Sequence, residues 1–421
     1  MSCFKLVREP KGGVPPLVGS LSDFERALSL LESAPGPVAV DAERAAMYRY
    51  SHGNYLVQMK KKGTPIFLFD IPTLSSQGAD LSRLSYVSPM WVLHDSLQDI
   101  PAFAQMGAVP SSIFDTQVAC MFLGRERMGL ARCTEDFLGV SLEKEFATAD
   151  WSLRPLPRPW RNYAALDVEF LLDLEGAEEE ALRKKGMQDW AKEEFSTLLR
   201  KGRECKKRQD PWRGVSNITA LGSDRLGLAV VRELWEAREE VARNLDLAPG
   251  LVLKDETIIE LALKKPRSER EFRETGAAER VKVEKNCELD LLFDRYIPLQ
   301  QQIKPKTWKE AVDRALSLRP SSLPRPAASP SKRGAAVPSS MKIWEKRHPD
   351  RLRRLEKASE EVGAAAKSLG IPSSFLISPR ILREYFWTLP RGGEIEDFLR
   401  SKGINDWRLS LIVKVIEASN L

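Results

Sequence analysis

The sequence predicts an α/β domain followed by two smaller helical domains. Residues 38–71 alternate β-rich runs with turn signals, which is typical of neighbouring strands. Apolar residues then recur at helical spacing up to about residue 200, and no convincing strand run follows Asn217. At 421 residues, the chain is too long for one ordinary hydrophobic core. We therefore expect two or three domains.

The strands are predicted from short runs in the first hundred residues. VAVDAE, NYLVQM (54–59) and PIFLFDI (65–71) are separated by turn signals and predict a meander of three strands. A fourth run, MWVLH (90–94), predicts another strand, and the apolar spacing of DSLQDIPAFAQMG after it is helical. Residues 113–200 are predicted to be helical throughout. Because strands and helices mix, an α/β domain is the simplest interpretation.

The second half of the chain is predicted to contain two helical domains and a connector. Amphipathic helices broken at Pro249-Gly250 form the first. Residues 319–340 carry five prolines and six serines with almost no large apolar side chain, so they are expected to form a linker. A similar order of helix, Gly/Pro turn and helix returns after the linker, which suggests a weak internal repeat. The predicted boundaries are 1–205, 212–298, 299–342 for the connector, and 343–421.

Composition excludes several classes of protein. The chain is 43% hydrophobic and 29% charged, as expected for an ordered globular protein. Its longest apolar stretches fall far short of the roughly 20 residues that cross a bilayer, and the N-terminus lacks the apolar region of a signal peptide. Five scattered cysteines without a CxxC pair suggest neither a disulfide framework nor a zinc site. We expect a cytoplasmic protein without a membrane partner.

The net charge of +6 is unevenly distributed. Residues 1–200 hold 22 basic and 27 acidic side chains, whereas residues 201–421 hold 43 and 32. Residues 301–350 alone carry 11 basic and 4 acidic side chains, while residues 211–300 carry 15 and 17. A polyanionic partner is therefore expected to contact the connecting segments of the second half more than the surface of its first helical domain.

Carboxylates at the ends of predicted elements are the strongest chemical signal. Asp41 and Glu43 end the first strand two residues apart, so their side chains share one face. Asp99 lies where the fourth strand gives way to a helix, and Tyr163 and Asp167 are spaced i, i+4 in a helical pattern. Four acids and a phenol are thus predicted to converge.

Such a group suits phosphodiester hydrolysis with divalent metal. Mg²⁺ and Mn²⁺ prefer oxygen ligands, and two ions about 3.5–4 Å apart can clamp the attacking and leaving oxygens. Without metal, the carboxylates would repel one another and their pKa values would rise. Each residue alone has an ordinary structural explanation, such as a helix N-terminus for Asp99 or a surface pair for Tyr163 and Asp167. Their joint order favours the catalytic interpretation.

The motifs around these residues resemble a known family. VAVDAE, VLHDSLQDI and YAALD resemble the three signature motifs of the DEDD exonucleases with tyrosine, and FDTQVACMFLG, GLARCTEDFLGVSLEK, DWSLRPL and NYAALDVEFLLDL resemble ribonuclease D, over about residues 35–200. RLGLAVVRELWEAREEVARNLDLAPGLVLKDETIIELA resembles the HRDC domain, and residues 348–421 resemble a second, divergent copy. The resemblance implies a ribonuclease H-like exonuclease domain, with a mixed sheet flanked by helices, and two all-α HRDC-type domains.

The resemblance also implies roles for the site residues. Asp41, Glu43, Asp99 and Asp167 would hold two divalent cations, Mg²⁺ or Mn²⁺, and Tyr163 would orient the nucleophilic water. The implied reaction is stepwise 3′-to-5′ removal of nucleoside 5′-monophosphates from RNA with a free 3′ end, in the maturation of tRNA precursors and other small RNAs. No obligate protein partner is evident.

Several residues are candidates for contacting RNA. Arg44 replaces the aromatic residue that usually follows the DxE motif, and it is expected either to touch a phosphate or to lie on a solvated face. Trp151 and Arg154, in the DWSLRPL loop, are expected either to face the RNA or to hold the loop. A basic run is expected to be a solvated face or to follow phosphates; its residues are Lys201, Arg203, Lys206, Lys207 and Arg208.

Other residues have structural interpretations. His94 is expected to be a packed histidine rather than a ligand, and Asp115 a helix N-cap. Two other functions remain open: a DNA 3′-5′ exonuclease, which uses the same four acids, and a non-catalytic RNA-binding scaffold. A helicase is disfavoured because the chain contains no GxxxxGK[ST] phosphate loop.

Overall fold

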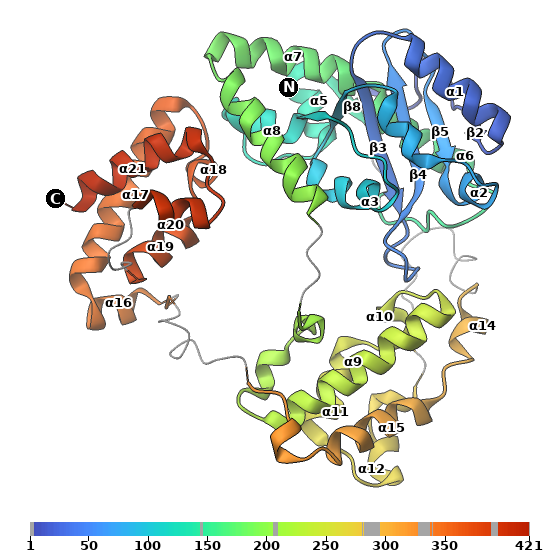
Figure 1. Ribbon diagram of the computed structural model, residues 1–421, viewed down its shortest axis with the longest axis vertical. Coiled ribbons are helices and arrows are strands. Elements are labelled where there is room, and N and C mark those ends of the chain that lie inside the picture. Colours follow the sequence, from blue (N-terminus) through green and yellow to red (C-terminus); the bar gives the residue numbers. More distant parts are fainter. Residues whose placement is uncertain are drawn as a thin grey trace.

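The computed structural model describes residues 4–143, 146–204, 209–279, 281, 295–326, 337–338, 340–388 and 395–420. These residues form an α/β domain and two helical bodies, which we call the first helical unit (described residues between 209 and 326) and the second helical unit (described residues from 340 to 420) (Figure 1). The described part of the chain contains no helix both long and apolar enough to cross a membrane. The expected cytoplasmic location stays a prediction.

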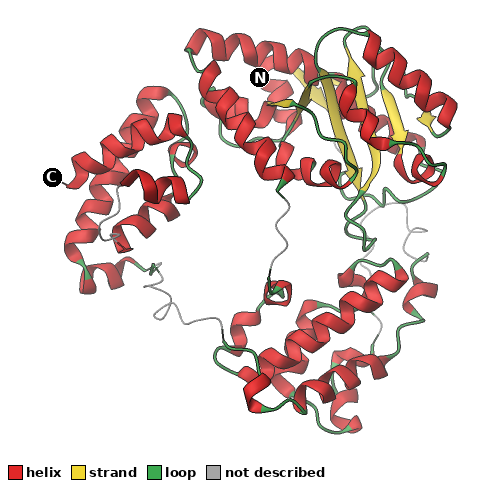
Figure 2. Cartoon of the chain, viewed as in Figure 1, coloured by secondary structure: helices red, strands yellow, loops and turns green. Residues whose placement is uncertain are grey.

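A six-stranded mixed sheet forms the centre of the α/β domain, as predicted (Figure 2). Its strands run in the order β2-β5-β4-β3-β6-β7. The predicted meander is antiparallel, β6 and β7 continue it in parallel beside β3, and β2 pairs in parallel with β5. The bounds are β2 (Leu17–Val18), β3 (Val38–Arg44), β4 (Asn54–Lys61), β5 (Phe67–Asp70), β6 (Met90–Leu93) and β7 (Ser112–Asp115).

The expectation that residues 113–200 are entirely helical is wrong at two places. β7 pairs with β6 so that Ile113 lies opposite Trp91 and Phe114 opposite Val92. A second, two-stranded sheet joins β8 (Val140–Leu142) to β1 (Lys5–Val7) in parallel. Apolar runs of only three or four residues have no measurable periodicity, and here pairing with distant strands decides their conformation.

Helices flank the sheet of the α/β domain (Figure 2). They are α1 (Leu21–Ser33), α2 (Ile71–Ser76), α3 (Ile100–Gln105), α4 (Thr116–Phe122), α5 (Leu130–Leu138), α6 (Arg158–Glu169), α7 (Leu171–Lys185) and α8 (Gln188–Arg203). Helix α6 packs against β3 and β4. The buried residues of α6 include Trp160, Ala164 and Ala165. This packing brings the middle of α6 to the end of β3.

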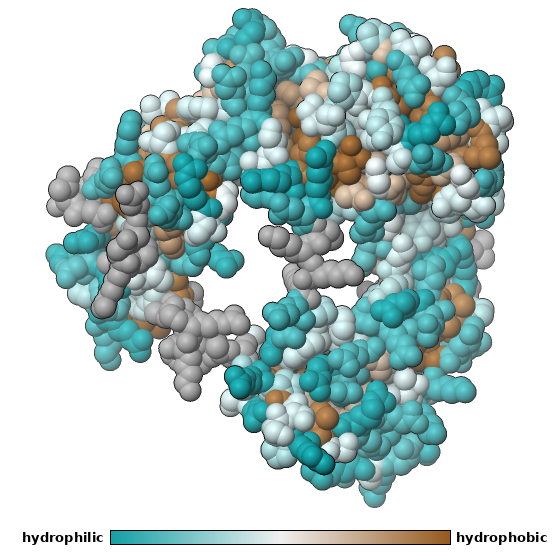
Figure 3. Space-filling model, viewed as in Figure 1, coloured by the Kyte–Doolittle hydropathy of each residue, from teal (hydrophilic) through white to brown (hydrophobic). Residues whose placement is uncertain are grey.

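The first helical unit surrounds its own apolar core. Its longer helices are α9 (Arg225–Leu245), α11 (Asp255–Lys264) and α15 (Pro305–Leu316), and its shorter ones are α10 (Pro249–Val252), α12 (Glu269–Arg273) and α14 (Ile297–Gln300). The visible face of this unit is mostly hydrophilic (Figure 3). The unit can therefore bury most of its apolar surface without help from the α/β domain.

The structure corrects the predicted connector at residues 299–342. Helix α15 lies inside that range, yet it packs along α9 and buries Trp308, Ala311 and Val312. The start of the proline-rich segment is held as well, because Arg225 donates to the backbone oxygens of Pro320 and Leu323. The prediction of a connector rested on the net basic charge and the prolines of this range, and it overlooked the amphipathic spacing of apolar residues in α15. Residues 327–336 and 339 lie outside the described residues.

The second helical unit repeats the first in its succession of helices. It contains α16 (Met341–Arg347), α17 (Pro349–Leu369), α18 (Ser373–Leu376), α19 (Pro379–Thr388), α20 (Ile395–Ser401) and α21 (Asp406–Asn420). Helices α17, α18 and α19 have 21, 4 and 10 residues, the lengths of α9, α10 and α11. Both 21-residue helices end at a left-handed residue, Asp246 and Gly370. The repeat expected from the sequence is thus visible in the fold.

Candidate active site

Three carboxylates meet where β3 lies against α6. Asp41 and Glu43 alternate along β3 with the buried Val40 and Ala42, and Asp167 comes from α6. A carboxylate oxygen of each acid lies within 4.8 Å of the other two. All three residues are half-buried. The structure therefore brings together three of the four predicted metal ligands in one group.

Burial and mutual repulsion make this group costly when it is fully ionised. Burial, followed by the charges of Asp99 and Asp167, raises the pKa of Asp41 well above its ordinary value. Burial, followed by the charges of Asp41, Asp167 and Asp99, also raises the pKa of Glu43. A cluster of this kind either takes up protons or binds a cation. A compensating positive charge is thus the natural occupant of the site.

Asp99 lies beside the three-carboxylate group and is paired with Arg44. It follows the short turn Ser96–Gln98 and precedes α3, as the sequence predicted. Burial raises the pKa of its carboxyl to about 6, while the Arg44 guanidinium, which donates a hydrogen bond to it, opposes that rise. The β3–β4 register shifts between Glu43 and Arg44. Arg44 is thus an internal counter-ion, which neither expectation for this residue anticipated.

Tyr163 lies one helical turn before Asp167 on α6, and the two side chains share a hydrogen bond. Burial, followed by the charge of Asp167, raises the pKa of the phenol. Phe146 and Trp151 surround the ring, each with a centroid distance of 6.2 Å. The phenol therefore keeps its proton at neutral pH and is held at the edge of the carboxylate group.

The DWSLRPL loop is built into the protein interior, which corrects the RNA-facing alternative for Trp151 and Arg154. Trp151 is fully buried and packs on Trp160 at a centroid distance of 5.6 Å. Arg154 donates to both carboxylate oxygens of Asp70 at 2.7 and 2.8 Å. It also donates to three backbone oxygens, those of Tyr55, Trp151 and Leu153. All five N–H groups of its guanidinium are thereby used.

The predicted basic run lies only partly within the described residues. Lys201 and Arg203 are exposed at the end of α8, and Arg203 donates a hydrogen bond to the backbone oxygen of Pro110. Lys206, Lys207 and Arg208 lie outside the described residues. A role for this run in RNA binding stays a prediction.

His94 and Asp115 have the structural roles that the sequence predicted. The ring nitrogens of His94 lie 2.8 Å from Thr116 Oγ1 and 2.9 Å from the Met128 carbonyl oxygen. Asp115 caps α4 by accepting from Val118 N, and it also accepts from Ser96 N at 2.8 Å. Through this last bond, the cap fixes the turn that leads to the candidate ligand Asp99.

A buried thiol pair was not suggested by the sequence. Cys120 Sγ lies 2.9 Å from Cys133 Sγ and donates to Glu178 Oε1 at 3.0 Å. The hydrogen bond with Cys133 and burial raise the pKa of Cys120, and burial raises that of Glu178. All three side chains are buried, so the cluster lies in the core of the α/β domain. The cysteines are 13 positions apart in the sequence, a spacing that matches no redox or zinc motif.

Sequence reasoning missed the walls of the pocket beside Glu43. This pocket has a volume of about 180 Å³. One wall comes from residues 46–48, which belong to what we call the rim segment (residues 45–50), and the other from residues 147–149, which belong to what we call the rim loop (residues 147–152). The lining residues are Ala42, Glu43, Arg44, Ala46, Met47, Tyr48, Ala147, Thr148 and Ala149. The basic and aromatic composition of RAAMYRY was the only signal available.

Three parts of the chain match known protein families. Residues 17–182 match the family described as 3′-5′ exonuclease, and residues 227–291 match the HRDC domain. Residues 336–419 match the family described as 3′ to 5′ exonuclease C-terminal domain, whereas the sequence had suggested a divergent HRDC copy there. The two helical units thus match separately described families, although their helices follow the same succession.

Curated relatives are named Ribonuclease D. The relative from Sphingobium indicum is 32% identical over 43% of this chain and 46% of its own length. The relative from Acidiphilium cryptum is 32% identical over 47% of this chain and 52% of its own length. The chain therefore spans about half the length of these relatives.

Solved structures extend the likeness over nearly the whole chain. A crystal structure of a protein from Bifidobacterium adolescentis is 42% identical, with a TM-score of 0.91 and 99% of both chains covered. Escherichia coli RNase D, described as an exoribonuclease involved in structured RNA processing, shares the fold at 21% identity, with a TM-score of 0.65 over 96% of this chain and 98% of its own. The chain thus contains a 3′-5′ exonuclease domain and an HRDC domain, its first half is similar in sequence to relatives named Ribonuclease D, and it shares the fold of Escherichia coli RNase D.

Proposed function

We propose that the chain is a metal-dependent 3′-5′ exoribonuclease. The observation that carries this proposal is the convergence of Asp41, Glu43 and Asp167 within 4.8 Å, with the protonated phenol of Tyr163 beside them. The exonuclease family match and the relatives named Ribonuclease D support the reaction class and the choice of RNA. Removal of one nucleoside 5′-monophosphate at a time from a free 3′ end follows from that class.

The residues of the site fit a hard divalent cation. The donor set consists of carboxylate oxygens alone, which suits Mg²⁺ or Mn²⁺ rather than a softer metal. Burial and neighbouring carboxylates raise the pKa values of Asp41 and Glu43, so a bound cation would stabilise their ionised forms. Asp41, Glu43 and Asp167 would hold metal, and Asp99 would join them when Arg44 releases it. Two bound cations would acidify water and neutralise charge on the scissile phosphate.

The protein groups around the carboxylates have separate tasks. Tyr163 keeps its proton, so its hydroxyl can donate to or accept from the attacking water and fix its direction. Arg44 carries a permanent charge next to Glu43 and Asp99, which suits it to contact a phosphate oxygen when its bond to Asp99 opens. Neither group needs to change its own protonation state during hydrolysis.

The substrate we propose is a structured RNA with a 3′ extension, such as a tRNA precursor. The relatives' name supports RNA, and the excess of basic residues after position 200 supports a polyanionic partner. Part of the positive charge of residues 301–350 lies at α15, because Lys304, Lys306 and Lys309 are at or near the start of this helix. That helix N-terminus adds to the attraction for phosphate.

The test uses purified protein and a 5′-labelled tRNA carrying a 3′ extension. We expect a ladder that shortens by one nucleotide at a time with Mg²⁺ or Mn²⁺, nucleoside 5′-monophosphates as products, and no reaction with chelator. A matched DNA oligonucleotide that is cleaved faster than RNA would overturn the substrate assignment. Bound but intact RNA with either metal would instead favour the non-catalytic scaffold.

A further inference from the structure

The first helical unit contacts the α/β domain at the rim of the candidate active site. Figure 1 places α10 next to the loop that follows β3. Ala248 N, at the start of α10, donates to the backbone oxygen of Tyr48 at 3.0 Å. Arg243, on α9, donates to the hydroxyl of Tyr50 at 3.2 Å. The rim segment is therefore held from outside the α/β domain, directly after the strand that carries Asp41 and Glu43.

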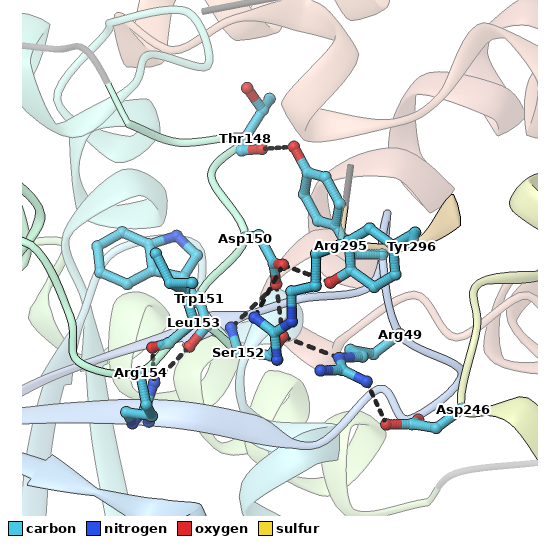
Figure 4. A network of polar contacts seen from close by, with 11 residues as sticks. Arg49, Thr148, Asp150, Trp151, Ser152, Leu153, Arg154, Asp246, Arg295 and Tyr296 are labelled. Atoms are coloured by element: carbon cyan, nitrogen blue, oxygen red, sulfur yellow. Dashed lines mark hydrogen bonds and ion pairs between the residues drawn. The ribbon is translucent and has the colours of Figure 1, made fainter. Parts of the chain in front are cut away.

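The rim loop is held by the same unit through a buried hydrogen bond. Asp150 and Tyr296 are both fully buried, and the Tyr296 hydroxyl donates to Asp150 Oδ2 (Figure 4). The other carboxylate oxygen of Asp150 accepts from Ser152 N at 3.1 Å and from Ser152 Oγ at 2.6 Å. Arg295 Nη1 is 3.9 Å from Asp150 Oδ2. Without the Tyr296 hydroxyl, the buried Asp150 carboxyl group would lose its hydrogen bond from the first helical unit.

The two walls are joined to each other as well as to Tyr296. The Tyr48 ring stacks on the Tyr296 ring at a centroid distance of 6.0 Å, and the Tyr48 hydroxyl donates to the Thr148 carbonyl oxygen at 2.9 Å. Arg49 Nε donates to Ser152 Oγ at 2.9 Å, while its guanidinium lies 5.5 Å from the Tyr296 ring centre. Tyr296 thus touches the rim segment at Tyr48 and the rim loop at Asp150.

We propose that Tyr296 is a positioning residue for the nuclease site. It sets the separation of the rim segment and the rim loop, which form the pocket of about 180 Å³ beside Glu43. The first helical unit would then shape the pocket that receives the 3′-terminal nucleotide, in addition to any contact it makes with RNA further away. This inference rests on the proposed exonuclease function.

This proposal is tested with a substrate too short to reach the rest of the first helical unit while it is bound at the candidate active site. A p-nitrophenyl ester of thymidine 5′-monophosphate presents one scissile bond and one nucleoside to the site. For Tyr296→Phe in the full-length chain, we expect KM for this ester to rise about fivefold while kcat changes by less than twofold. The control is Asp246→Asn, which removes a charge from the exposed edge of the same interface but from neither pocket wall, and its KM should stay as in wild type.

A second measurement does not depend on turnover. Titration with uridine 5′-monophosphate and Mg²⁺ should show Kd weakened by a similar factor in Tyr296→Phe. A double-mutant cycle with Asp150→Ala should be non-additive, because either substitution removes the hydrogen bond between the two side chains. Unchanged KM and Kd, with weaker cleavage of long RNA alone, would overturn the proposal and assign the unit to RNA binding only. Failure of wild-type protein to cleave any substrate would overturn the proposed function instead.

Discussion

The two helical units share a succession of helices but are attached to the α/β domain in opposite ways. The second unit is attached through apolar side chains and a buried acid: Trp407 stacks on Trp190 at 5.2 Å and packs on Phe122 at 5.0 Å. The first keeps a separate core and meets the rim of the site through polar groups and one tyrosine stack. A shared core favours stability, whereas a small polar interface can be coupled to a site without dominating folding.

The largest effect expected from this comparison is on stability. Trp407→Ala should destabilise the folded chain by about 4 kcal/mol, because it removes a buried indole from the junction with the α/β domain. The free energy of unfolding is measured by urea denaturation, monitored by far-ultraviolet circular dichroism because the substitution removes a fluorescent tryptophan. Tyr296→Phe is the matched variant from the other interface. A larger loss of stability in Tyr296→Phe than in Trp407→Ala would reverse the comparison.

The next effect concerns the buried acid of the same junction. Glu194 accepts from Asn405 Nδ2 at 2.6 Å and pairs with Arg408 at 3.1 Å, and all three are buried. Glu194→Gln should cost about 3 kcal/mol, because it leaves the Arg408 charge without its partner. The midpoint of urea unfolding is the readout. Wild-type stability in this variant would show that the apolar contacts alone hold the junction.

Tyr163→Phe tests the candidate active site itself, where we expect an effect on the cleavage rate rather than on stability. We expect the single-turnover cleavage rate to fall about 10- to 100-fold, since the phenol no longer orients water, which corresponds to roughly 1.4–2.8 kcal/mol. Stability should change little, unlike in Trp407→Ala. An unchanged rate would show that the hydroxyl has no part in positioning water.

The smallest effect is expected at the exposed edge of the first unit's interface. Asp246 pairs with Arg49 at 3.2 Å, but its side chain is 51% exposed. Asp246→Asn should change the free energy of unfolding by less than about 1 kcal/mol, and high salt should reduce even that difference. A loss comparable with that of Glu194→Gln would mean that this interface, too, is a stability element.

Local sequence patterns predicted the elements that carry the site. The alternation along β3 placed Asp41 and Glu43 on one face, and the i, i+4 spacing placed Tyr163 beside Asp167. They also predicted Asp115 as a cap, because capping depends on neighbouring residues only. The candidate metal ligands and the tyrosine remain a proposal, but their juxtaposition follows from those local rules and the packing of α6 on β3.

Tertiary contacts decided what local patterns missed. β7 and β8 are too short to be distinguished from helix by periodicity, and pairing defines them. The Arg154 guanidinium donates to Asp70, which lies in another part of the chain. Arg44 donates to Asp99, and the two residues are 55 positions apart. No spacing rule connects Asp150 to Tyr296, 146 residues apart. The site's acids were therefore predictable, whereas its counter-ion and its walls were not.

The central claim is that the carboxylate group on β3 and α6 hydrolyses RNA from the 3′ end. The most direct measurement compares wild type with Asp41→Asn on 5′-labelled RNA under single turnover with Mg²⁺, alongside RNA binding measured with chelator. We predict one-nucleotide shortening by wild type, and intact RNA with undiminished binding by the variant. Cleavage by Asp41→Asn at the wild-type rate would contradict the account.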